Sequence, residues 1–201
     1  MLDGSQFKIL TTIPTQHARR AAELHFAAFE GKIGGILGRD GRGAAYFADI
    51  INPAFGLCAV SRNGKQLLGI AGFKTAEGAL IGGEFSDLRK RYGFIGAVWR
   101  GLILSVLERD VEPDRLLMDG IAVVPAMRGP GVGSALLDAI VEEAERRGKS
   151  EVRLDVIDIN PRARALYERK GFVAGEIQSL GPLKYVFGFK TATTMVKQTR
   201  I

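Results

Sequence analysis

The chain has few of the residues that build disulfide frameworks or metal centres. Its single cysteine, Cys58, cannot form an internal disulfide, and its two histidines, His17 and His25, have no partner at metal-ligand spacing. The most apolar run, 94–107, is shorter than the roughly 20 residues of a membrane-spanning helix and contains Arg100. No basic-then-apolar leader opens the sequence. We therefore expect a cytoplasmic protein with no metal and no membrane partner.

Lysine-rich tails, zinc spacings and interleaved aromatic and basic residues are also missing, although the chain is basic. The net charge is +6 and the isoelectric point is about 9.6, with the arginines scattered along the chain. This pattern argues against a nucleic-acid partner and suits a small phosphorylated ligand. With 201 residues, of which 46% are hydrophobic and 25% charged, the chain is expected to fold as one domain over 1–201.

The first half of the chain is predicted to combine short strands with helices. Apolar runs bounded by turn residues predict three strands, over 7–10, 56–61 and 66–73. The Asn63-Gly64 step between the last two predicts a hairpin. Apolar residues at helical spacing predict three helices, over 16–29, 44–51 and 86–109. Glycines at 31, 34, 35 and 38 follow the first helix.

The second half alternates strands with helices. Strands are expected over 116–124, 151–156, 172–177 and 184–189. Helices are expected over 133–147 and 161–170, each ending at a glycine. Together with the hairpin, this order predicts an α/β (α+β) protein with a mixed, mostly antiparallel sheet of six to seven strands flanked by helices.

The densest chemical signal is the glycine-rich turn after the strand over 116–124. Glycines at 129, 131 and 133 let the backbone approach an anion, Arg128 adds a cation, and the helix that follows directs its first N–H groups to the same point. A dinucleotide fingerprint would need glycine or alanine at Ser134, and the Lys-Ser/Thr pair of a nucleoside-triphosphate loop is absent. The turn alone predicts an anion site, with a ligand-free turn as the alternative.

A second motif, one strand later, makes the interpretation specific. It reads Asn-x-x-Ala-x-x-Leu-Tyr-x-x-x-Gly-Phe, with Asn160, Ala163, Leu166, Tyr167, Gly171 and Phe172 at the named positions. With the Arg-x-x-Gly-x-Gly pattern of the first turn, in the same order and at a similar separation, the chain resembles the GNAT superfamily of N-acetyltransferases. The resemblance is strong over about 116–172 and slight before 115.

The resemblance implies a GNAT-like acyl-CoA N-acyltransferase fold with acetyl-CoA as cosubstrate. The backbone of the preceding strand would pair with the pantetheine arm, at Ile121, Ala122 and Val123. The turn would hold the diphosphate, through Arg128, Gly129, Gly131, Val132, Gly133 and Ser134. Asn160 would bond the cofactor arm, and Tyr167 would lie near the thioester sulfur.

The chemistry needs few groups. A neutral amine must attack the thioester carbonyl, a backbone donor such as the Val123 N–H must meet the oxyanion, and the departing thiolate gains from a proton donor, for which we choose Tyr167. Asp155 and Asp119, at parallel positions on neighbouring strands, and Glu84 are the candidate general bases. Each of these carboxylates could instead be structural.

The sequence therefore predicts an N-acetyltransferase acting on a primary amine of a small molecule or protein, with a cofactor-binding core over 115–175. The alternative is a domain that binds acetyl-CoA as a sensor or scaffold without turnover. Roughly forty residues separate the third and fourth expected strands, where the family usually has a short turn. We interpret this helical insertion, about 84–112, as either a lid over the acceptor site or the surface of a homodimer.

Overall fold

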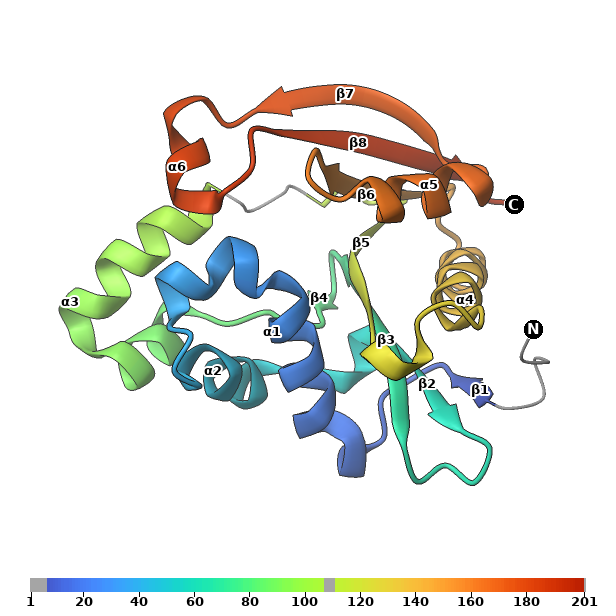
Figure 1. Ribbon diagram of the computed structural model, residues 1–201, viewed down its shortest axis with the longest axis horizontal. Helices are drawn as coiled ribbons and strands as arrows, with labels where there is room; N and C mark the ends of the chain where they lie inside the picture. The colour runs from blue at the N-terminus through green and yellow to red at the C-terminus, as the bar shows by residue number, and fades with distance from the viewer. Residues whose placement is uncertain (1–6, 107–110, 201) are drawn as a thin grey trace.

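The computed structural model describes residues 7–106 and 111–200, and an eight-stranded sheet runs through it (Figure 1). The strand order is β1-β2-β3-β5-β6-β8-β7, with the two-residue β4 beside β3. Only the β5–β6 pairing is parallel among the described pairs. The strands are β1 (Phe7–Leu10), β2 (Gly56–Ser61), β3 (Leu67–Thr75), β4 (Gly78–Ala79), β5 (Arg115–Val123), β6 (Glu151–Ile157), β7 (Val173–Ser179) and β8 (Thr191–Gln198). The predicted mixed, mostly antiparallel sheet is confirmed.

Helices cover both faces of the sheet. In Figure 1, α1, α2 and α3 gather on one side and α4 lies on the other, where it contacts β2, β3 and β5. The helices are α1 (Thr15–Leu37), α2 (Arg42–Ile50), α3 (Phe85–Ser105), α4 (Val132–Arg146), α5 (Pro161–Arg169) and α6 (Lys184–Phe187). One buried cluster joins α4 to the sheet, and a second joins α1, α2 and α3. No helix in the described ranges has both the length and the apolar character needed to cross a bilayer.

The first helix is longer than the prediction over 16–29. Gly31, Gly34 and Gly35 lie inside α1, which continues to Leu37. Glycine costs about 1 kcal/mol in a helix interior, but Ile33 and Leu37 in the last turns are buried, and their packing offsets that cost. The helix ends at Gly38, whose φ of 94° stops the helical path.

The strand predicted over 184–189 is wrong, because this segment forms α6 instead. A Gly181–Leu183 turn leads into the helix, and Gly188, with φ 73°, closes it by donating its N–H to the Lys184 carbonyl at 2.9 Å. The aromatic and β-branched composition suggested a strand, but a single helical turn buries Phe187 beside Phe189. The last strand is β8, which pairs with both β6 and β7.

The helical insertion is fixed to the carboxyl end of α1. A capping box at Glu84 begins α3, Gly93 kinks it at φ 71°, and the predicted end at 109 lies outside the described residues. Tyr92 Oη donates to the Leu37 carbonyl at 2.8 Å, and Arg100 Nε donates to the Ile36 carbonyl at 2.9 Å. The last carbonyls of a helix lack partners within it. By supplying those partners, α3 is bound firmly to α1.

We expect Tyr92→Phe to lower the free energy of unfolding by about 1 kcal/mol, because it removes one hydrogen bond while keeping the ring. Urea denaturation measures the change. Tyr185→Phe is the matched control, since Tyr185 is 84% exposed on α6 and should leave the unfolding midpoint unchanged. Equal midpoints for the two variants would show that α3 is not held by this bond.

Candidate functional site

The two parallel strands part at their carboxyl ends. Pairing between β5 and β6 runs from Arg115↔Glu151 to Met118↔Leu154 and stops there. Beyond it, β5 continues against β3 up to Val123, and β6 continues against β8 up to Ile157. Each strand is thus held on its outer side while a fork opens between them. Backbone N–H and C=O groups along such a fork lack a strand partner and can bind an extended ligand.

A β-bulge lies at the base of this fork. Gly72 pairs with Gly120, and Phe73 pairs with Met118, so the register skips Asp119. Bulges redirect side chains and are common next to active sites. Asp119 and Asp155 are the first residues after the last β5–β6 pair, as their predicted parallel positions require. Both carboxylates border the same cavity.

The glycine-rich turn follows β5, and no other side chain in the described part of the chain covers the backbone at Gly129 or Gly131. Gly129 and Gly131 have φ of 112° and 94°, and a Cβ at either would find no atom within 4 Å. No side chain caps the start of α4 at Gly131. Arg128 Nε donates to the Val123 carbonyl at 3.2 Å, which fixes the guanidinium beside the turn. The turn therefore presents open space, N–H groups and a cation together.

The second motif meets the first at the start of α4. A Cβ on Gly133 would lie 3.7 Å from both Val123 Cγ2 and Leu166 Cδ2, so β5, α4 and α5 converge here. The Asn160 carboxamide oxygen accepts the Ala163 N–H at 3.2 Å and caps α5. Its amide nitrogen is the group that could donate to a ligand.

Neighbouring residues at the start of α4 and at the end of β5 differ in burial. The Val132 side chain is fully buried against the sheet and anchors the first turn of α4, whereas Ser134 is half-buried. On the strand, Ala122 is buried, and Ile121 and Val123 are half-buried. Val132 and Ala122 thus belong to the core, and Ile121 and Val123 pack against its edge.

Two cavities share Asp119. The fork chamber, about 270 Å³, is bounded by β5, β6, β8 and α1, at residues that include His25, Phe29, Asp119, Asp155, Ile157 and Phe189. The α3 chamber, about 420 Å³, lies between α1, α2, α3 and the sheet, at residues that include Leu37, Tyr46, Lys74, Glu84, Leu88, Gly101 and Asp119. Asp119 is the carboxylate common to both linings.

The electrostatics distinguish the candidate acids and bases. Burial raises the pKa of Asp119 from 3.8 to about 7, although the nearby Lys74 ammonium partly opposes the shift. Asp155 accepts a hydrogen bond from Thr194 Oγ1 at 2.8 Å, and Glu84 accepts the Asp87 N–H as the cap of α3. A carboxylate with a pKa near 7 is suited to general-base catalysis at neutral pH.

Tyr167 lies outside the linings of both chambers, in the core between α5, α4 and the sheet. It is 8% exposed, and its ring centroid is 6.0 Å from that of Phe172. Burial raises the pKa of its hydroxyl to about 12, so the group stays protonated at neutral pH.

Sequence reasoning missed His25, for which it noted only the lack of a partner at metal-ligand spacing. The structure has it in the fork chamber, tilted against Phe29 and Phe47, with its buried Nδ1 lacking a hydrogen-bond partner among the described residues. Burial lowers the pKa of His25 to about 4, so the imidazole is neutral. The spacing of His25 and Phe29, one helical turn apart, indicates a shared face of α1 but not what that face meets.

A sheet that forks beside a glycine-rich, uncapped helix start is an arrangement that can bind an extended, phosphorylated ligand. The chain belongs to the acetyltransferase (GNAT) family, whose model matches residues 19–172. The resemblance noted in the sequence is thereby confirmed.

Relatives agree with this family. The chain is 41% identical over 87 residues to the alanine N-acetyltransferase of ribosomal protein bS18 from Escherichia coli (strain K12), which is 43% of this chain and 59% of that enzyme. It is 39% identical over 56 residues to the thialysine N-epsilon-acetyltransferase of Bos taurus, 28% of this chain and 33% of that one. The chain thus spans about 59% of the length of the bacterial relative it matches.

Solved structures share the fold. An N-acetyltransferase from Staphylococcus aureus Mu50 has a TM-score of 0.64 at 14% identity, covering 94% of this chain and 100% of that one. A Salmonella typhimurium protein solved with its cofactor acetyl-CoA has a TM-score of 0.59 at 17% identity, covering 97% and 95%. At these identities the likeness establishes the architecture.

We expect a carbon-13 NMR titration of the carboxyl groups to find Asp119 with a pKa near 7. Asp119→Asn identifies the resonance, because it alone disappears. Since the folded-state pKa is raised, the folded protein retains the Asp119 proton between about pH 4 and about pH 7, where the unfolded chain has lost it. Wild type should therefore lose stability relative to Asp119→Asn as the pH rises through this window. A titration complete below pH 5 would contradict the burial of this carboxyl.

Proposed function

We propose that the protein transfers the acetyl group of acetyl-CoA to a primary amine. The observation that carries the proposal is the fork between β5 and β6, with the Gly131 turn beside it and Asp119 at its base. The named activities of the relatives, acetylation of an alanine amine in bS18 and of thialysine, support the same class of acceptor. The cytoplasm, expected from the sequence, remains the proposed location.

The residues at the turn fit the diphosphate of such a cosubstrate. A Cβ at Gly129 or Gly131 would enter the space that the phosphates need, and the first N–H groups of α4 point along the same axis with Arg128 beside them. Val132, Gly133 and Ser134 supply those N–H groups. The Asn160 amide nitrogen and the backbone of Ile121, Ala122 and Val123 would bond the pantetheine amides along the fork.

The thioester supplies an activated acetyl group. We assign Asp119 as the base that accepts the proton of the attacking amine, directly or through one water, because its pKa of about 7 suits neutral pH. In this assignment Asp155 is a second carboxylate that borders the fork chamber, where it accepts a hydrogen bond from Thr194. The Val123 N–H is the proposed donor to the developing oxyanion.

Tyr167 is proposed to donate to the departing sulfur. An ordinary thiol has a pKa near 8.5, well below that of the buried phenol at about 12, so complete proton transfer to a thiolate is uphill. A hydrogen bond to the developing charge is the larger contribution, worth roughly 1.5–3 kcal/mol. This role distinguishes an enzyme from the alternative, a sensor that binds acetyl-CoA without turnover.

Gly131→Asp should raise the Kd for acetyl-CoA at least about a hundredfold, because it adds a side chain and a negative charge where the phosphates would lie. Titration calorimetry measures the Kd, and circular dichroism verifies folding. Gly148→Asp is the matched control: it follows the opposite end of α4, also has positive φ at 67°, and also faces open space. Wild-type affinity in a folded Gly131→Asp protein would move the diphosphate elsewhere.

Tyr167→Phe should slow single-turnover acetyl transfer about ten- to a hundredfold while the Kd for acetyl-CoA stays nearly constant, because only the bond to the sulfur is lost. Rapid-quench measurement under single-turnover conditions keeps product release from masking the effect. Tyr185→Phe, at an exposed position, controls for nonspecific effects. An unchanged rate would leave Tyr167 as a packing residue.

A further inference from the structure

We propose that the α3 chamber is the acceptor site and that it selects a small primary amine with one charge and an apolar body. The inference rests on the acetyl transfer proposed above and adds the class of substrate. It also gives the helical insertion a role: the inner face of α3 is a wall of the acceptor site.

The position of the chamber follows from how the two linings divide. Residues of β6 and β8, including Asp155, Ile157 and Ala192, border only the fork chamber, at the base of the fork proposed to hold the cosubstrate. Residues of α3, including Leu88 and Leu104, border only the α3 chamber. Asp119 borders both, so an amine entering from the α3 side meets the proposed base at the boundary with the fork chamber.

The charges of the α3 chamber fit a single ammonium group. Asp119 and Glu84 are its carboxylates and Lys74 is its cation, which leaves one net negative charge once Asp119 is ionised. Burial raises the pKa of the Tyr46 hydroxyl to about 12, so this group remains neutral. A second ammonium on the substrate would therefore gain no further net charge to pair with.

Most of the remaining lining side chains are apolar, and Tyr46 and Ser105 add hydroxyl groups. Side chains from three helices line it, including Ile33, Leu37, Ile50, Phe85, Leu88 and Leu104. About 420 Å³ lies within the usual range for small-molecule sites. The bonds of Tyr92 and Arg100 to α1 hold the far wall in place.

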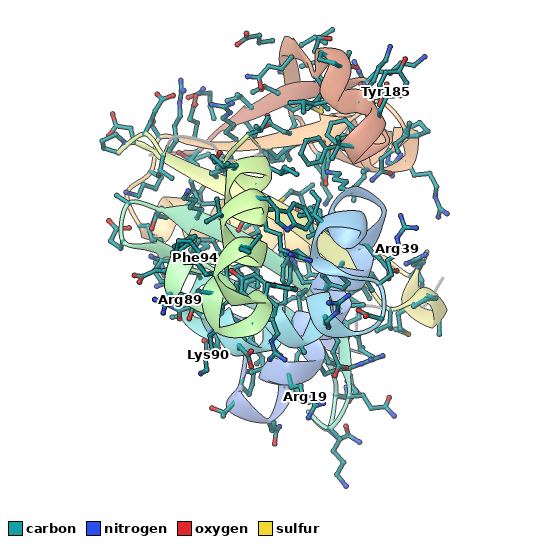
Figure 2. All side chains as sticks on the ribbon, turned by 90° about the vertical axis from the view of Figure 1, so that its left-hand side faces the viewer. Arg19, Arg39, Arg89, Lys90, Phe94 and Tyr185 are labelled. Carbon is teal, nitrogen blue, oxygen red and sulfur yellow. The ribbon has the colours of Figure 1, made fainter. Side chains whose placement is uncertain are left out.

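The outer face of α3 differs from its inner face. Figure 2 shows α3 toward the viewer with Phe94, Arg89 and Lys90 on the outward side. Ile95 is 83% exposed and borders neither chamber. Substitutions on the two faces therefore separate a change in the chamber from a change in the helix.

Gly101 allows the chamber to be filled without altering Asp119. It lines the chamber, and a Cβ there would lie 3.9 Å from Leu88 Cδ1, an ordinary contact. We would compare wild type, Gly101→Phe and the matched control Ile95→Phe on n-alkylamines from ethylamine to octylamine, the diamine 1,6-hexanediamine, and a hexapeptide with an N-terminal alanine. Thiol release gives kcat/KM, and calorimetry gives amine binding without turnover.

In wild type and Ile95→Phe, kcat/KM should rise about three- to fourfold per methylene until the chamber is full, following the transfer of each group out of water. The diamine should react more slowly than hexylamine. In Gly101→Phe, hexylamine should lose at least about tenfold, the equivalent of two methylene contacts, while ethylamine and the Kd for acetyl-CoA stay unchanged. Gly101→Leu replaces Gly101→Phe if circular dichroism shows the larger variant to be unfolded.

The outcomes separate the two proposals. Equal thiol release by Gly101→Phe and wild type on hexylamine, or a preference for the hexapeptide or the diamine, overturns the chamber assignment and leaves acetyl transfer intact. A second outcome is that wild type binds hexylamine, Gly101→Phe does not, and no acceptor gives thiol release. This outcome supports the chamber assignment and overturns acetyl transfer. Absence of both amine binding and thiol release overturns both.

Discussion

The end of β5–β6 pairing after Met118 is the constraint on which the site depends. A sheet normally satisfies its backbone groups by continuous pairing, and here each strand keeps its outer partner while losing the inner one. The bulge at Asp119 permits the separation without breaking the β3–β5 pairing. The opening therefore exists because the outer strands, β3 and β8, hold the sheet together around it.

The shape of the proposed acceptor site depends on a different set of bonds. Carbonyls at the end of α1 need partners from outside that helix, and Tyr92 and Arg100 of α3 provide them. The Arg100 guanidinium also stacks 4.2 Å from the Tyr92 ring centroid and 4.1 Å from that of Trp99. The insertion is thus tied to the core helix that carries His25 and Phe29, and this helix lines both chambers.

Local signals were readable from the sequence, and long-range arrangements were not. The turn at Gly131 and the helix that follows Asn160 were predictable because their backbone demands are met within a few residues. The matched positions of Asp119 and Asp155 followed from parallel strands, but the bulge that directs Asp119 did not, since it depends on pairing with β3. His25 gave no signal because its place in the fork chamber depends on where α1 crosses the sheet. The prediction for 184–189 was wrong for a related reason. Its apolar composition suits a strand, and only the glycines around it make it a helix.

The pKa of Asp119 links the two halves of the proposal. An alkyl ammonium such as that of lysine has a pKa near 10.4, so a carboxylate with the ordinary value of 3.8 would accept its proton only at a high free-energy cost. Burial raises the pKa of Asp119 to about 7 and removes roughly 4 kcal/mol of that cost, while Lys74 keeps the group partly ionised at neutral pH. The apolar walls of the α3 chamber act on the other partner, because desolvation lowers the pKa of an ammonium and so opposes the effect of the Asp119 and Glu84 carboxylates. The same burial that makes Asp119 a better base therefore makes the bound amine a better acid, and an apolar acceptor is the substrate for which both effects operate together.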